Sequence, residues 1–249
     1  MPSLFLFRTL VGALLLSCLS FSVSTLAQLQ VAASTWPPYV DENAERRGAA
    51  TVIVEEALKR AGYDLNMVVD IWPRSLEGTR SGVYDVIAAA WYSDERNKEL
   101  AFSKPFLKNN LKFVVVKNRG LKYDQLEDLN GKMIGTIIDY AYGEPFDSAS
   151  LAIRAPANHT IQNLRRLTLG QIDMVLADEQ EALYLIRTLL PDQANNLEIL
   201  PRAISTNGLH IAVSREHPQH QEILKAFNAE IETMNADGSL KKILQDYGM

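Results

Sequence analysis

The sequence predicts an α/β protein of two lobes, each a mostly parallel sheet flanked by helices, joined by two crossing hinge strands. From residue 29 onward, short apolar runs alternate with amphipathic stretches of helical period. Strands that alternate with helices form parallel sheets, and nearly continuous apolar runs are typical of strands covered on both faces. After an apolar run at residues 111–118, the alternation restarts at residue 126. The restart predicts a second lobe, with crossing strands near Val115 and Ile211.

The first lobe is expected to take residues 28–114 and 210–249. In "ATVIVEEALKRAG", four apolar side chains fall on one side of a helix that a glycine ends. Pro73 stands at the first turn of a second, short helix, where proline is tolerated. The predicted elements here are strands at 29–34, 64–71, 85–91 and 111–118, and helices at 50–62 and 73–82.

The second lobe is expected to take residues 115–209. Its pattern is a turn and strand, an amphipathic helix in "NHTIQNLRRLTLGQ", a strand, and another helix. A late strand and two C-terminal helices, separated at Asp237-Gly238, return the chain to the first lobe. The predicted ranges are 126–138, 158–171, 172–177, 178–190, 209–214, 219–236 and 239–247.

Composition and charge indicate a globular protein whose partner is a small molecule or another protein. The chain has 249 residues, of which 47% are hydrophobic and 22% charged. That length suffices for one large or two small domains. The net charge of −5 provides no basic field for nucleic acid or an anionic membrane surface. We therefore expect neither as a partner, and we expect a monomer.

Residues 1–27 have the pattern of a secretory signal peptide. Arg8 is the only charged side chain, "TLVGALLLSCLSFSV" is apolar, and small residues precede Ala27. The alternatives are an uncleaved anchor, for which 15 apolar residues are short, and lipidation at Cys18. We expect cleavage after Ala27 and a periplasmic mature protein without cysteine. No other stretch could span a membrane.

Aromatic residues follow three of the predicted strands. Trp36 and Tyr39 flank two prolines after the first strand, Trp72 follows the second, and Trp91 ends the third. Ligands of open α/β sheets bind at the carboxyl ends of strands, often between domains. These rings are therefore candidate walls of a ligand site, and the alternative is that they close the core of the lobe.

The stretch "YSDERNKELAFSKPF" places an arginine just beyond the third strand. Ser93 stands three residues before Arg96 and can cap a short helix. A planar guanidinium there can hold a carboxylate through two hydrogen bonds. The alternative is a surface ion pair between Arg96 and Asp94, Glu95 or Glu99, which would contribute little to stability.

In the second lobe, Asp178 ends a strand and begins a helix. "DEQE" fits a capping box, with Asp178 as N-cap and Glu181 at the third position. The functional alternative is a carboxylate that accepts hydrogen bonds from a ligand ammonium. Asp139 and Tyr140 stand at the end of another strand of this lobe.

No motif indicates catalysis or a cofactor. The chain has no glycine-rich phosphate loop, GxSxG or HExxH. His217 and His220 are three residues apart beside Pro218, but without a nearby cysteine a solvated helix start is favoured over a metal site. We expect no metal, no cofactor and no enzymatic activity.

Four segments together resemble a known family. They are "GVYDVIAAAWYSDERNKELAFSKPF", "LNGKMIGTI", "LTLGQIDMVLAD" and "NADGSLKKILQDYG". In this order they are similar to the periplasmic amino-acid-binding proteins of ABC importers, bacterial solute-binding protein family 3. The resemblance covers residues 28–249 and implies the type II periplasmic binding protein fold, with two lobes that close on a ligand.

The resemblance also implies roles for individual residues. Arg96 matches the arginine that binds the ligand carboxylate, and Asp178 matches the aspartate that binds the ligand ammonium. Trp36 matches an aromatic that packs on the ligand side chain, and Trp72 falls in the opposite wall. The implied partner is an ABC permease.

The chain departs from the family pattern around this site. Ala89, Ala90 and Trp91 stand where relatives often have small hydroxyl residues, and "DYA" at residues 139–141 replaces Gly-Thr-Thr. Ala33 stands where binders of basic amino acids have an acid. A lysine or arginine ligand is therefore disfavoured, although the acidic side chain of Asp139 argues against that conclusion. The pocket is expected to be more aromatic than in relatives.

The sequence thus predicts a binding protein for a small amino-acid-like or carboxylate ligand. One alternative is a periplasmic enzyme similar to cyclohexadienyl dehydratase, in which Glu181 matches the catalytic acid. The other is a free-standing sensor that docks on a membrane receptor.

Overall fold

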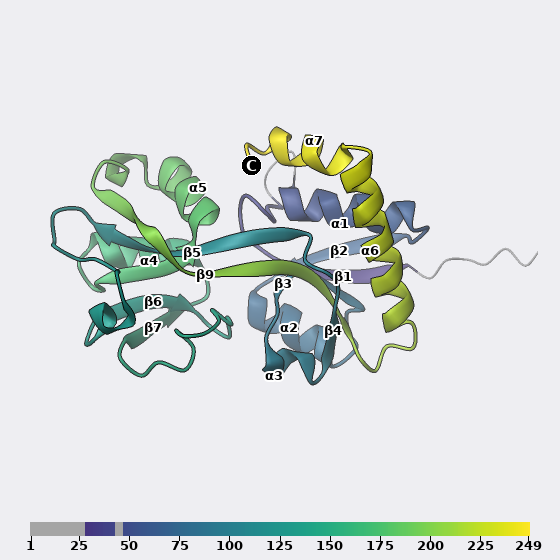
Figure 1. The fold of residues 1–249 in the computed structure, drawn as a ribbon, viewed down its shortest axis with the longest axis horizontal. Coiled ribbons are helices and arrows are strands. Elements are labelled where there is room, and N and C mark those ends of the chain that lie inside the picture. Colours follow the sequence, from purple (N-terminus) through teal and green to yellow (C-terminus); the bar gives the residue numbers. More distant parts are fainter. Residues whose placement is uncertain (1–27, 43–46) are drawn as a thin grey trace, which may run out of the picture.

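The computed structural model describes residues 28–42 and 47–249 as two α/β lobes connected by two long strands. Figure 1 shows β5 (Leu107–Val116) and β9 (Leu197–Ser214) running side by side from one lobe into the other. The two-lobed architecture predicted from the sequence is confirmed. The predicted signal peptide and Cys18 lie outside the described residues.

The first lobe combines the N-terminal half of the chain with its C-terminal helices. Its sheet has parallel strands in the order β2-β1-β3, followed by β9, with β4 also on β9. Its core includes Val31, Ile53 and Phe227. Its elements are β1 (Leu29–Ser34), α1 (Ala49–Arg60), β2 (Leu65–Asp70), α2 (Trp72–Arg80), β3 (Val86–Trp91), α3 (Asp94–Asn97), β4 (Leu100–Phe102), α6 (His220–Ala236) and α7 (Ser239–Asp246).

The second lobe repeats the plan on a smaller scale. Its strands follow the order β5-β8-β6-β7, with β6 parallel to both β7 and β8. Leu164, Val175 and Leu185 belong to its core. Its elements are the 3-10 helix η1 (Leu126–Leu129), β6 (Met133–Ile137), β7 (Ile153–Ala157), α4 (Thr160–Thr168), β8 (Met174–Asp178), α5 (Glu179–Leu189) and the 3-10 helix η2 (Pro191–Gln193).

Three strand segments were not predicted: β4, β7 and the first half of β9. Pro156 lies within β7, and proline argues against a strand in the sheet interior, but β7 is the edge strand of the second lobe. β4 has three residues, too few to show alternation. The first half of β9 contains Pro201 and exposed polar residues, which conceal its pairing with β5.

Gly48 holds the start of α1 against the loop that follows β1. Its φ is 96°, and a Cβ added there would lie 2.3 Å from the carbonyl oxygen of Tyr39. We expect Gly48→Ala to lower the free energy of unfolding by about 2 kcal/mol, since the backbone strain is combined with a clash. The matched control is Gly82→Ala, where φ is 76° but no atom lies within 4 Å. Urea denaturation of both variants should show the larger loss for Gly48→Ala, and equal losses would contradict this explanation.

Candidate ligand site between the lobes

The pairing of the strands brings the ends of β3 and β8 to the boundary between the lobes. Trp91 at the end of β3 pairs with Leu209 of β9, which in turn pairs with Leu107 of β5. Asp178 at the end of β8 pairs with Leu111 of the same β5. Along β5, the positions that correspond to the two strand ends are thus offset by four residues, or about 13 Å. This register places the carboxyl ends of strands from both lobes around one space.

Arg96 is buried in this boundary, with 4% of its surface exposed. Its Nη1 donates to the Trp91 carbonyl at 2.7 Å, and its Nη2 donates across the lobes to the Asp139 carbonyl at 2.6 Å. The guanidinium also lies 4.7 Å from the centre of the Trp72 ring. Burial lowers the pKa of Arg96 to about 10. Ser93 caps the short helix by accepting from the Arg96 backbone N–H, as predicted.

The alternative of a surface ion pair at Arg96 is wrong. Glu95 pairs with Lys98 at 2.8 Å, and Glu99 pairs with Arg80 at 2.9 Å. Within residues 28–42 and 47–249, no carboxylate forms an ion pair with Arg96. The carboxylates of Asp139 and Asp147 offset part of the charge of Arg96 from a distance. A buried guanidinium whose hydrogen bonds go only to neutral carbonyls still favours an anionic ligand.

Asp178 is buried on the opposite side of the boundary, with 1% of its surface exposed. Its carboxylate accepts from the Tyr39 hydroxyl of the first lobe at 2.9 Å and from the Asn109 side chain at 3.1 Å. It also accepts from the Glu181 backbone N–H at 2.9 Å, as the N-cap of α5. Burial raises the pKa of Asp178 to about 6, while these hydrogen bonds oppose the shift.

Asn109 connects the two halves of the site, and the sequence analysis missed it. It is fully buried in β5, and its side-chain oxygen accepts from the Trp91 indole at 2.9 Å while its amide donates to Asp178. A hydrogen-bonded chain thus runs from Trp91 through Asn109 to Asp178. The predicted strand began at Leu111, two residues after Asn109, whereas β5 begins at Leu107.

Glu181 completes only half of the predicted capping box. Its backbone N–H donates to the side chain of Asp178, but its own carboxyl lies near Thr160 and Trp36 instead of returning to the N-cap. Only 5% of the residue is exposed. Burial raises the pKa of Glu181 to about 8, the charge of Asp178 adds to the rise, and Thr160 and Trp36 oppose it. Two buried carboxyl groups, those of Asp178 and Glu181, therefore lie in the first turn of α5.

This pair makes stability depend on pH in a defined direction. Because the folded pKa of Glu181 is about 8 against an ordinary value of 4.5, folding favours the protonated form. The free energy of unfolding should fall as pH rises from about 4.5 to about 8. Glu181→Gln cannot ionise, so we expect a smaller fall in urea denaturation at pH 5 and pH 8. Glu222→Gln, at an exposed position, should match the unsubstituted protein, and a parallel fall in Glu181→Gln would contradict the assignment.

Aromatic rings fill the centre of the boundary. The Tyr140 ring, from the loop after β6, lies 5.2 Å from Trp91, 5.8 Å from Trp72 and 6.5 Å from Trp36. We call these four side chains the aromatic cluster. They and Ser34, Ala89 and Arg96 enclose a space of only about 20 Å³.

Two larger cavities also lie between the lobes, and they share no lining residue. The arginine-side cavity, of about 620 Å³, is lined by Arg80, Arg96, Asp139, Tyr140 and Arg154 among others. The glutamate-side cavity, of about 570 Å³, is lined by residues including Thr35, His159, Glu181 and Leu185. Seven of the nine predicted site residues line the arginine-side cavity or the small space of the aromatic cluster, whereas Tyr39 and Asp178 line none of the three spaces.

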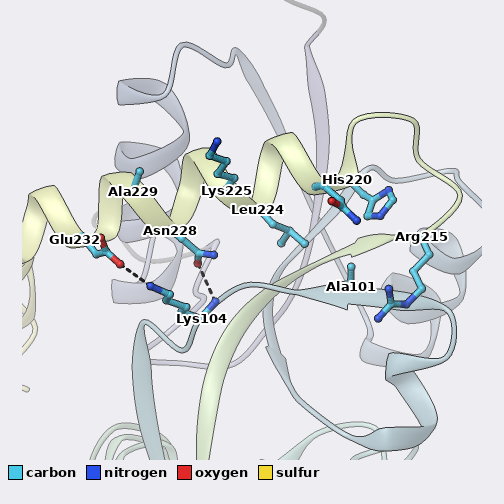
Figure 2. A pocket seen from close by; sticks show the side chains of 10 residues that line it. Ala101, Lys104, Arg215, His220, Leu224, Lys225, Asn228, Ala229 and Glu232 are labelled. Carbon is cyan, nitrogen blue, oxygen red and sulfur yellow. Dashed lines mark hydrogen bonds and ion pairs between the residues drawn. The ribbon is translucent and has the colours of Figure 1, made fainter.

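A groove on the outer face of the first lobe has a different character. Figure 2 shows it between α6 and the segment that follows β4. Two charged residues of the groove pair with each other, since the Lys104 ammonium lies 2.7 Å from the Glu232 carboxylate. The Lys104 backbone N–H donates to the side chain of Asn228. It contains none of the predicted site residues.

The described ranges offer little for metal chemistry or for membrane insertion. No three His, Cys, Asp or Glu side chains within them are grouped so as to hold a metal ion. His217 instead lies 3.4 Å from Asp85. None of the helices in these ranges has the length and apolar character needed to cross a bilayer.

Comparisons with known proteins agree with this geometry. The family model of bacterial extracellular solute-binding proteins, family 3, matches residues 29–249. The L-cystine-binding protein TcyJ of Escherichia coli (strain K12) is 23% identical over 218 residues, which cover 86% of this chain and 79% of that protein. The probable histidine-binding protein of Campylobacter jejuni is 24% identical, covering 83% of this chain and 78% of that protein.

Solved structures share the fold. An ancestral arginine-binding protein bound to arginine superposes with a TM-score of 0.76 at 24% identity, covering 88% of this chain and 97% of that one. A histidine kinase sensor domain with similarity to periplasmic binding proteins gives a TM-score of 0.79 at 19% identity, covering 89% and 96%.

Proposed function

The chain belongs to the bacterial extracellular solute-binding proteins of family 3, and from this premise we propose that its lobes capture a small α-amino acid or a related carboxylate for an ABC importer. The observation that carries the proposal is that the lobe boundary contains both a buried guanidinium without an ion-pair partner in the described residues, Arg96, and a buried carboxylate, Asp178. The relatives bind cystine, histidine and arginine by name.

The ligand's two charged groups have complementary positions in this site. Arg96 lines the arginine-side cavity, where its remaining N–H groups would receive a carboxylate. Asp178 would receive the ammonium in exchange for the hydrogen bonds it accepts from Tyr39 and Asn109. Trp36, Trp72 and Trp91 would cover the rest of the ligand. Tyr39, Ser93, Asp139 and Tyr140 would complete the site.

Lobe closure would couple binding to presentation of both lobes to a permease. Interlobe hydrogen bonds join Arg96 to Asp139, Trp72 to Asp139, Tyr39 to Asp178 and Tyr184 to Asp41. A ligand that contacts both lobes shifts the population toward the closed arrangement. The hinge would lie in β5 and β9, with the predicted boundaries at residues 114/115 and 209/210. The mature protein would reach the periplasm as a monomer after cleavage behind Ala27.

A thermal-shift screen of residues 28–249 tests this function. The probes are the twenty standard amino acids and small carboxylates such as succinate and pyruvate. A ligand that binds only the folded state raises the melting temperature by mass action. We expect at least one α-amino acid to do so. A screen without any shift by an α-amino acid would count against the proposal.

One observation favours an enzymatic alternative. A buried glutamic acid with a pKa of about 8 that lines an interlobe cavity is a group suited to general acid catalysis. We nevertheless propose binding without catalysis, because the relatives named above are binding proteins. Incubation with prephenate or arogenate, followed by product absorbance, should show no turnover. Turnover that Glu181→Gln abolishes would reverse the assignment.

A further inference from the structure

Tyr140 reaches from the second lobe into the space where the first lobe presents its aromatic walls. Its ring contacts those of Trp36, Trp72 and Trp91. The preceding residue fixes the loop, because the Asp139 carbonyl accepts both from Arg96 at 2.6 Å and from the Trp72 indole at 3.0 Å. Asp139 itself adopts a φ of 58°, a left-handed conformation that aspartate adopts more readily than most residues other than glycine.

The charges of residues assigned to the ligand's head group act on the Tyr140 phenol. Burial raises the pKa of the Tyr140 phenol, the carboxylates of Glu181 and Asp178 raise it further, and the Arg96 guanidinium lowers it.

Little space remains beside this ring. The enclosed volume of about 20 Å³ is enough for about one water molecule and too small for an amino-acid side chain. From these contacts we infer that Tyr140 determines the size of the ligand, because its ring occupies the side-chain subsite among the three tryptophans. This inference rests on the proposed function. Ligands with bulky side chains must displace Tyr140, whereas small amino acids and short carboxylates need not.

Removing the ring should relax this restriction in a specific direction. Tyr140→Ala leaves a subsite walled by three tryptophans, which suits another aromatic ring. L-phenylalanine and L-tyrosine could then enter the subsite without displacing the Tyr140 ring. Tyr140→Phe retains the ring and removes only the hydroxyl, so it serves as the matched control.

Isothermal titration calorimetry with L-phenylalanine and L-tyrosine tests the inference. We expect both to bind Tyr140→Ala at least tenfold more tightly than they bind the unsubstituted protein or Tyr140→Phe. The gain in affinity should accompany a loss of melting temperature without ligand, because aromatic contacts between the lobes are removed. If Tyr140 had only a structural role, Tyr140→Ala would have both a lower affinity for these ligands and a lower melting temperature. Equal affinities in the three proteins, or no binding to Tyr140→Ala, would overturn the inference.

A second measurement needs no ligand. Trp36, Trp72 and Trp91 are the only tryptophans of the chain, and all three contact the Tyr140 ring. Acrylamide quenching of tryptophan fluorescence should therefore rise about twofold in Tyr140→Ala and stay unchanged in Tyr140→Phe. Unchanged quenching in Tyr140→Ala would show that the ring does not cover this subsite.

The two hypotheses fail separately. If the unsubstituted protein binds a small amino acid while Tyr140→Ala shows neither the gain in affinity nor the rise in quenching, the proposed function stands and the role of Tyr140 falls. If no amino acid binds the unsubstituted protein or either variant, the proposed function falls, and the role of Tyr140 in ligand size falls with it.

Discussion

Arg96→Ala is expected to weaken the binding of an α-amino acid by about 10- to 100-fold. A hydrogen bond to a charged group contributes about 1.5–3 kcal/mol, and here the charge is buried, where solvent screens it little. The side chain donates hydrogen bonds to two carbonyl groups, lies over the Trp72 ring and forms no ion pair within the described residues, so its charge remains available to a carboxylate. Titration calorimetry of the variant and the unsubstituted protein measures the difference.

Arg74→Ala is the matched control for this experiment. Arg74 stands near the start of α2, beside Trp72, but its side chain is 70% exposed and pairs with Asp70. Its removal should leave affinity within about twofold, because exposed ion pairs contribute little. Arg96→Lys keeps a charge but loses the planar fork, so an intermediate affinity is expected. Unchanged affinity in Arg96→Ala would remove Arg96 from the site.

Asp178→Asn is expected to weaken the binding of α-amino acids by at least tenfold and to leave the binding of analogues without an amine nearly unchanged. Asparagine retains the N-cap of α5, since its side-chain oxygen can accept from the Glu181 backbone N–H. The substitution removes the negative charge that would receive the ammonium. Calorimetry with an α-amino acid and with the corresponding carboxylic acid lacking the amine separates the two contributions.

Glu179→Gln controls for the loss of a negative charge at the same helix terminus. Glu179 is the neighbouring residue and pairs with Lys112 at 2.7 Å. We expect this variant to bind both compounds with nearly unchanged affinity. If Asp178→Asn weakened the amino acid and its deaminated analogue equally, Asp178 would have a structural role and no direct contact with an ammonium.

Much of the fold could be predicted because its local and global signals agree. The apolar runs that became β1, β3 and β8 are buried on both faces, and helix signals such as Pro73 and Asp178 fall at the observed helix starts. The short strands β4 and β7 escaped prediction because they lack these features. β7 contains a proline that is tolerated only because no further strand pairs beyond it.

The candidate site was predictable as a set of positions, but its internal contacts were not. Arg96, Asp178 and the tryptophans could be selected because ligands of open α/β sheets bind at the carboxyl ends of strands, a rule that depends only on topology. The role of Asn109 depends on the register between β5 and β8, which the sequence does not specify. The contact between Tyr140 and three tryptophans depends on the relative placement of the lobes. The departures at residues 139–141 indicated a changed pocket without showing that a ring fills it.

The central claim is that Arg96 binds the ligand's carboxylate between the lobes. Its most direct test is a comparison of affinities by calorimetry, using the α-amino acid that most raises the melting temperature and its α-amide. We predict that the unsubstituted protein binds the amide at least tenfold more weakly than the acid, and that this difference disappears in Arg96→Ala. Equal affinities for acid and amide in the unsubstituted protein would contradict the claim.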